Sequence, residues 1–385
     1  MRAAVSDQCL DTEVIDDSID AVCAAVAHSD GELHALVADA VRRIAALADP
    51  RTQEAIERAA LARLAGLAEL QPLLDDRSVD EVLVTGRRIW VEREGRLRPA
   101  GDLRSTSVEH LIERVLAPIG RRIDTLSPIV DARLPDGSRV CAVIPPVAIG
   151  GASLSIRRFA QRVRPLSDFA EPAVEEICRH VVDHRCNVLV SGATSSGKTS
   201  LLASLLGLVD PTARLIVIED TAELPCGADH LVRLEARPAD AEGVPAIDLD
   251  RLVRTALRLR PDRLVVGEVR GDEVLALVQA MNTGHDGSFS TCHANGPLDA
   301  LLRIESLVLQ AAPRWPLAAI RRQIVRSIDV VVHVERDATT GRRRISSVHE
   351  VELEAPVDES RPPTLRRLDG AHGGAARPEP SRRRT

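Results

Sequence analysis

A single lysine stands out in a chain whose other Lys/Arg positions are all arginine. Of the 50 Lys and Arg residues only Lys198 is lysine, and it lies in Gly192-Ala-Thr-Ser-Ser-Gly-Lys-Thr199. This stretch matches G-x-x-x-x-G-K-[ST], in which backbone N–H groups surround nucleotide phosphates and the lysine reaches the β- and γ-phosphates. A bias toward arginine, as GC-rich codons produce, spares a lysine only where a bulky planar cation does not fit. Lys198 is therefore predicted to fill a site that needs a compact ammonium group.

The predicted phosphate loop stands between an apolar strand at 187–190 and a helix that carries Leu201 and Leu205. The N-terminus of such a helix attracts anions. The hydroxyl after the lysine is the usual magnesium contact of this loop. The predicted contacts with phosphate and magnesium are Gly192, Ala193, Thr194, Ser195, Ser196, Gly197, Lys198 and Thr199.

Two further apolar strands end in carboxylates. The strand at 215–218 is followed by Glu219, Asp220 and Glu223, and the strand at 264–266 is followed by Gly267 and Glu268. Ligands bind beyond the carboxyl ends of parallel strands, so these side chains are expected on the same edge as Lys198. Glu268 could hold magnesium through water, or orient and deprotonate an attacking water. A solvated strand end is an equal alternative for the first group.

Two histidines, His285 and His293, flank a short apolar strand in Gly284-His-Asp-Gly-Ser-Phe-Ser-Thr-Cys-His-Ala-Asn295. An imidazole can hydrogen-bond a γ-phosphate and respond to its loss. A purely structural histidine is the more common case, and no ligand spacing here supports zinc.

Composition limits the class of protein. A length of 385 residues with 44% apolar residues predicts two or three domains with sizeable cores. The net charge of −7 argues against non-specific nucleic-acid binding by the whole chain. The seven cysteines form no C-x-x-C pair, which argues against structural zinc and fits reduced thiols in the cytosol. The longest uncharged stretch, 140–156, is interrupted by Pro and Gly and is a poor membrane span, and no signal peptide is evident.

Hydrophobic periodicity and Pro/Gly positions predict five segments. An α/β domain with a mainly parallel sheet is expected to follow a small α+β domain, because β and α patterns alternate and the strands are continuously apolar. The predicted segments are a helical N-terminal segment (1–70), the α+β domain (71–160), a linker (161–172), the α/β domain (173–357) and a disordered tail (358–385).

Together, the four motifs resemble in order those of the type II and type IV secretion ATPases, and within that superfamily the ATPases of Tad-type (type IVc) pili. The resemblance covers about residues 70–355 and includes Arg121-Arg-Ile-Asp124, Arg133-Leu-Pro-Asp-Gly-Ser-Arg139 and Ile156-Arg-Arg-Phe159. It implies a RecA-like P-loop ATPase domain preceded by a PAS-like N-domain.

The resemblance also implies roles for individual residues. Glu219, Asp220 and Glu223 match an acidic motif that positions metal and water, and Glu268 matches the general base. His285 and His293 match a motif that senses the γ-phosphate. Arg133 and Arg139 match N-domain arginines that reach the triphosphate, and Arg270 is a further candidate near the site.

The implied function is a cytoplasmic ring, expected to be a hexamer, that hydrolyses ATP with Mg²⁺ at the inner face of the membrane. It would power Tad-type pilus assembly or secretion through an integral membrane platform protein, with residues 1–70 as the docking candidate and no specific nucleic-acid partner. Three alternatives remain: a conjugative or type IV secretion motor, a nucleotide-gated scaffold that barely hydrolyses ATP, and a nucleic-acid translocase. The lack of paired C-x-x-C motifs disfavours the type II secretion and type IVa/b pilus-extension branches.

Overall fold

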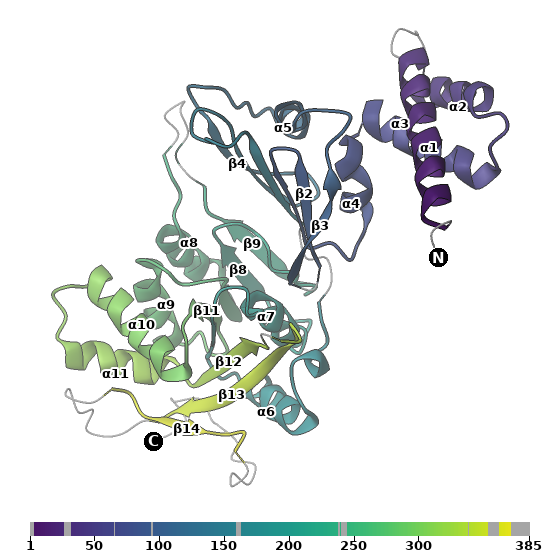
Figure 1. Ribbon diagram of the computed structural model, residues 1–385. Helices are drawn as coiled ribbons and strands as arrows, with labels where there is room; N and C mark the ends of the chain where they lie inside the picture. The colour runs from purple at the N-terminus through teal and green to yellow at the C-terminus, as the bar shows by residue number, and fades with distance from the viewer. Residues whose placement is uncertain are drawn as a thin grey trace. The chain divides into compact units, whose positions relative to one another are not determined.

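The computed structural model describes residues 4–26, 32–64, 66–93, 95–158, 163–237, 239, 245–337, 339–352 and 362–370, with side chains from residue 15 onward. The chain divides into two compact units, Met1–Phe159 and Ala160–Thr385 (Figure 1). Each unit has its own hydrophobic cores and is described by itself.

The first unit begins with three helices, α1 (Ala4–Val26), α2 (Leu33–Ile44) and α3 (Pro50–Leu64). Their buried apolar residues form one cluster that includes Val22, Val37, Val41 and Ile56. Asp49 caps α3 by accepting hydrogen bonds from the N–H groups of Arg51 and Thr52, and Pro50 occupies the first helical position. These helices correspond to the helical periodicity that the first 70 residues predict.

An antiparallel sheet forms the rest of the first unit. Its strand order is β3-β2-β1-β6-β5-β4, and β1 pairs antiparallel with β2 and with β6. One helix, α5 (Val108–Leu116), starts at the capping hydroxyl of Ser107 and shares a core with the sheet. The short α4 (Gln71–Asp75) precedes the strands β1 (Glu81–Thr85), β2 (Arg88–Arg93), β3 (Arg96–Asp102), β4 (Ile129–Arg133), β5 (Arg139–Val143) and β6 (Ser153–Arg157).

The second unit contains the predicted, mainly parallel sheet. Its strand order is β14-β13-β12-β7-β11-β10-β8-β9, and every neighbouring pair from β12 to β9 is parallel. The strands β12 and β13 form an antiparallel pair. The strands are β7 (Val188–Gly192), β8 (Leu215–Glu219), β9 (Leu231–Glu235), β10 (Arg263–Val266), β11 (Phe289–His293), β12 (Val330–Arg336), β13 (Arg343–Val351) and β14 (Leu365–Arg367).

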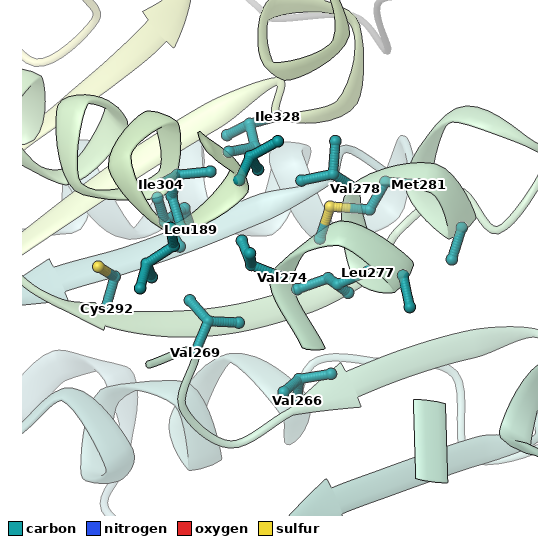
Figure 2. Close-up of a cluster of buried hydrophobic side chains, with 14 of the residues drawn as sticks. Leu189, Val266, Val269, Val274, Leu277, Val278, Met281, Cys292, Ile304 and Ile328 are labelled. Atoms are coloured by element: carbon teal, nitrogen blue, oxygen red, sulfur yellow. The ribbon is translucent and has the colours of Figure 1, made fainter. Parts of the chain in front are cut away.

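Helices cover both faces of this sheet, which explains why the residues of its central strands β7, β8, β10 and β11 are buried, except His293 at the end of β11. On one face the cluster drawn in Figure 2 joins Leu189 of β7 to Val274 and Leu277 of α9 and to Ile304 of α10. On the other face Val188 and Val190 pack with α6 and α7. The helices are α6 (Pro172–Asp183), α7 (Lys198–Leu206), α8 (Leu249–Ala256), α9 (Glu273–Asn282), α10 (Pro297–Ala311) and α11 (Leu317–Ser327). Within the described part of the chain, no helix combines the length and the apolar composition that crossing a membrane requires.

Two of the segment predictions need correction. Part of the predicted linker 161–172 belongs to the second unit, because Leu166 and Phe169 are buried in its core and the carbonyl of Phe169 accepts a hydrogen bond from Ile345 N. Part of the predicted tail 358–385 is ordered, because β14 pairs with β13 and Leu368 is buried. In both segments the few apolar residues that are buried in a core decide the structure. The rest of the tail, 358–361 and 371–385, lies outside the described residues.

Candidate active site

The predicted phosphate loop connects β7 to α7 through two glycines that cannot be replaced without displacing neighbours. A Cβ at Gly192 would lie 2.4 Å from the carbonyl oxygen of Val334 and 2.5 Å from Ser196 Oγ. At Gly197 the φ angle is +102°, which L side chains rarely adopt, and a Cβ would lie 2.5 Å from Cδ of Arg343. The loop therefore closes tightly over the start of α7, as close backbone approach to a phosphate requires.

Lys198 is buried at the first position of α7, with 7% of its surface exposed. Its Nζ donates hydrogen bonds to the carbonyl oxygens of Gly192, at 3.2 Å, and Ala193, at 3.0 Å. Burial lowers the pKa of Lys198, while the charge of Glu268 acts in the opposite direction. A buried ammonium group held by weakly basic carbonyls is available to a stronger anionic partner.

His293 connects this lysine to the carboxylate predicted as general base. Its Nδ1 lies 2.9 Å from Lys198 Nζ, and its Nε2 lies 2.9 Å from Glu268 Oε1. Burial, and next the charge of Lys198, lowers the pKa of His293 below its usual value. The neutral ring therefore accepts from Lys198 at Nδ1 and donates from Nε2–H to Glu268.

Arg270 extends the network to the strand that carries Asp220. Its guanidinium lies 3.1 Å from Glu268 Oε2 and 3.4 Å from Asp220 Oδ2. Both carboxylates follow strands whose carboxyl ends are adjacent, since β10 pairs with β8. Arg270 and Asp220 also line an open pocket of about 360 Å³ whose other residues are Asp248, Leu249, Asp250, Gly271, Asp272 and Glu273. This pocket is rich in carboxylates and contains no residue of the phosphate loop.

The loop fits a phosphate group on two observations besides its sequence. Ser196 Oγ is buried and has no hydrogen-bond partner among the described residues, and Ser195 is held at a φ of +59°. A hydroxyl left without a partner at the base of the loop can donate to a phosphate oxygen. Thr199 follows on the first turn of α7, where the residue is half-buried beside Lys198. Across the described residues no three His, Cys, Asp or Glu side chains cluster as metal ligands.

Residues 63–363 match the family model described as "Type II/IV secretion system protein". The chain belongs to this family. It is 39% identical over 302 residues to a Mycobacterium tuberculosis protein named for conjugal transfer, covering 74% of this chain and 84% of that protein. It is 34% identical over 287 residues to the conjugal transfer protein TrbB of Rhizobium radiobacter, covering 72% of this chain and 85% of TrbB. The X-ray structure of the Legionella pneumophila ATPase DotB has the same fold, with a TM-score of 0.51 and 22% sequence identity. The match covers 69% of this chain and 75% of the DotB chain.

As a member of this family the chain is an ATPase, and the predicted superfamily and α/β fold class are confirmed. The finer resemblance to Tad pilus ATPases is not supported to the same degree, because the relatives named above carry names from conjugal transfer.

Glu219 occupies a different position in this secretion ATPase from the catalytic one predicted. Its Oε1 accepts hydrogen bonds from the N–H groups of Glu223, at 3.0 Å, and Leu224, at 2.8 Å, and it is 6% exposed. Burial raises its pKa. A Cβ at Gly267 would lie 2.9 Å from Glu219 Cγ, so a larger residue at 267 would displace the buried Glu219 side chain. Glu219 thus shapes the loop that carries Asp220 and Glu223.

His285 lies away from the other predicted site residues. Because β11 runs parallel to β7, with His293 opposite Gly192, the segment before β11 lies at the other edge of the sheet. There His285 Nδ1 is 3.3 Å from the carbonyl oxygen of Ala280. His285 is therefore separated from His293 and the phosphate loop within this sheet, and its contact with nucleotide stays a prediction. Arg133 and Arg139 belong to the first unit, where they pair directly across β4 and β5.

Two residues near the loop were missing from the predicted site. Buried His333 on β12 forms a 2.8 Å hydrogen bond through Nδ1 with Ser191 Oγ, immediately before the loop. Arg343 on β13 contacts Gly197. Neither belongs to a recognisable motif, and strand pairing alone brings them to the loop.

Proposed function

We propose that this chain hydrolyses ATP with Mg²⁺ at the phosphate loop and uses the energy to drive conjugative transfer or type IV secretion. The observation that carries the chemistry is the chain of contacts from Lys198 through His293 to Glu268. It places the cation that binds phosphate next to the carboxylate that would act on water. Family membership and relatives with conjugal-transfer names support the transport role.

When nucleotide binds, Lys198 exchanges its carbonyl and imidazole partners for β- and γ-phosphate oxygens, which are stronger acceptors for an ammonium group. His293 then loses its donor at Nδ1 and can report the γ-phosphate. Glu268, held by His293 and Arg270, accepts the proton of the attacking water. Thr199 and Asp220 would hold the magnesium ion, which neutralises charge on the β- and γ-phosphates when bound.

Further parts of the proposal concern the assembly. Arg133 and Arg139 would stabilise charge on the triphosphate as the two units close, and a ring of six chains would act on an integral membrane platform from the inner face of the membrane. Glu223 would assist Asp220 in positioning metal and water. The support for these assignments is the resemblance of their motifs to those of secretion ATPases.

Phosphate release by the purified full-length chain tests the catalytic assignment. Glu268→Gln is expected to lower turnover by about 10²–10⁴-fold while the Kd of ATP stays within about twofold, because a general base acts on water and not on the nucleotide. Glu171→Gln, at an exposed carboxylate before α6, is the matched control and should turn over like the unmodified chain. In the same assay Arg133→Ala should lower kcat with ATP affinity unchanged.

Unimpaired hydrolysis by Glu268→Gln would remove Glu268 from the role of base. An unmodified chain that binds ATP without turnover in its assembled form would instead support the nucleotide-gated scaffold. The cargo is tested in the source cell by deleting the gene and restoring either the unmodified gene or the Glu268→Gln variant. Loss of DNA transfer or protein secretion supports the proposal, whereas loss of surface pili alone would favour a Tad-type pilus motor.

A further inference from the structure

Arg343 lies against the phosphate loop at its second glycine. A Cβ on Gly197 would come within 2.5 Å of Arg343 Cδ, 3.2 Å of its Nε and 3.3 Å of its Cγ. The arginine stem and the start of its guanidinium therefore occupy the space that a larger residue at 197 would need. Gly197 is the residue directly before Lys198 and the cap of α7, so Arg343 reaches the part of the loop that surrounds phosphate.

Strand pairing holds Arg343 in this position. Arg343 pairs with Arg336 across the β12–β13 hairpin, and the preceding pair on the same face is Val334 with Ile345, both buried in the core that contains α7. The other face carries Glu335 and Arg344, which form an ion pair at 3.5 Å. Because side chains alternate along a strand, Arg343 faces α7 and Arg344 faces away from it.

The direction of the bound nucleotide follows from the strand order. Glu268 follows β10 and His293 ends β11, and both strands lie on the same side of β7. The γ-phosphate must point to that side for water beside Glu268 to attack it. The β12–β13 hairpin lies on the other side of β7. The α-phosphate and nucleoside therefore leave the loop toward the hairpin, where Arg343 lies.

We propose that Arg343 is a second cationic contact of the nucleotide site, and that its guanidinium binds the α- and β-phosphates that ATP and ADP share. This rests on the proposed binding of ATP at the loop. A guanidinium is always charged and offers several donors in a plane, which suits a diphosphate.

Calorimetric titration of the full chain with ATP and with ADP tests this assignment. Arg343→Gln is expected to weaken both nucleotides by a similar factor, on the order of tenfold or more, because a charge-assisted hydrogen bond is lost to phosphates common to both. Arg343→Lys should recover part of the affinity. Arg344→Gln, one residue along and facing the other way, is the matched control and should leave both Kd values within about twofold.

Arg343→Met separates a phosphate contact from simple packing, because it keeps the apolar stem against Gly197 and removes the charge. Unchanged ATP and ADP affinity in Arg343→Met or Arg343→Gln would overturn the proposal, and so would equal losses in Arg344→Gln. Weakened ATP with unchanged ADP would also overturn it, since that places the contact at the γ-phosphate. An unmodified chain that binds neither nucleotide would instead contradict the proposed function.

Discussion

The two ends of β11 carry two histidines with very different surroundings. At the carboxyl end His293 lies beside Gly192 and bridges Lys198 and Glu268. Before the amino end His285 contacts the carbonyl oxygen of Ala280. A strand rises about 3.3 Å per residue, so the five residues of β11 alone span about 13 Å between the two environments. Residues of one motif can thus belong to two different environments.

The amino edge of the sheet also contains buried polar groups, and several of them are bound to the backbone, although Arg263 Nη1 has no hydrogen-bond partner among the described residues. Arg263 at the start of β10 is 5% exposed and donates to the carbonyl oxygen of Val182 at 2.9 Å. Burial lowers the pKa of Arg263 to about 10. Asn187 accepts from Ser288 N at 3.0 Å, and its own N–H donates to Asp329 Oδ2 at 2.7 Å.

The difference between the edges is the kind of partner that each polar group has. At the carboxyl edge Lys198 donates hydrogen bonds to backbone carbonyl oxygens, which are weak acceptors for an ammonium group, and Ser196 Oγ has no partner among the described residues. A ligand can therefore replace the first contacts and complete the second. At the amino edge the contacts hold the strands and their preceding turns together. The comparison predicts that substitutions at the carboxyl edge change turnover and those at the amino edge change stability.

Replacement of Lys198 should have the largest effect. Lys198→Ala and Lys198→Arg are both expected to reduce phosphate release at saturating ATP by about 10²–10³-fold or more, because the buried space beside Gly192 and His293 suits only a compact cation. Arg263→Lys is the reciprocal exchange at the amino edge and should lower the melting temperature with little change in kcat. Near-normal turnover of Lys198→Arg would contradict the size argument.

The two histidines provide a direct test of the comparison. His293→Ala removes the hydrogen bond to Glu268 and should lower kcat by roughly 10- to 100-fold, since a bond to a charged group contributes about 1.5–3 kcal/mol. His285→Ala, in the same motif, should leave kcat within about twofold. Equal losses of kcat in the two variants would contradict the assignment of the two histidines to different environments.

The smallest expected effect concerns His333 beneath the loop. Burial lowers the pKa of His333, with Glu335 and Asp299 acting in the opposite direction and Lys198 in the same direction. The unfolded chain therefore binds a proton near the usual histidine pKa of about 6.5, while the folded chain binds it only at lower pH. Its contribution to the free energy of unfolding is present above about pH 6.5 and is lost as the pH falls toward the folded pKa.

Denaturant unfolding between pH 7.5 and 5 measures this contribution. His333→Gln keeps a polar partner for Ser191 without the titrating ring, and should show a smaller loss of stability on acidification than the unmodified chain. An identical pH dependence of the two proteins would exclude His333 as a source of acid sensitivity.

Much of the second unit is predictable from local pattern. The strands β7, β8 and β10 each contain a continuous apolar run, and the Gly-rich loop precedes an apolar helix, so their identity follows from residue type. The strand β11, Phe-Ser-Thr-Cys-His, is mixed in composition although most of it is buried. The edge strands are harder, because β9 is only half-buried and β14 has three residues in a segment rich in Pro and Arg. Their structure depends on a neighbouring strand that the local composition does not reveal.

The site divides in the same way. Residue types and their order already dictate a phosphate loop with a carboxylate after a nearby strand, because parallel strands have their carboxyl ends at one edge of the sheet. The residues concerned are Gly197, Lys198, Thr199, Glu268 and the motif of His293. Nothing in the local sequence distinguishes Arg343 from its neighbours Arg342 and Arg344, Glu219 from Asp220, or His285 from His293. Those distinctions depend on strand direction, side-chain alternation and burial, which arise only when segments distant in the chain pack together.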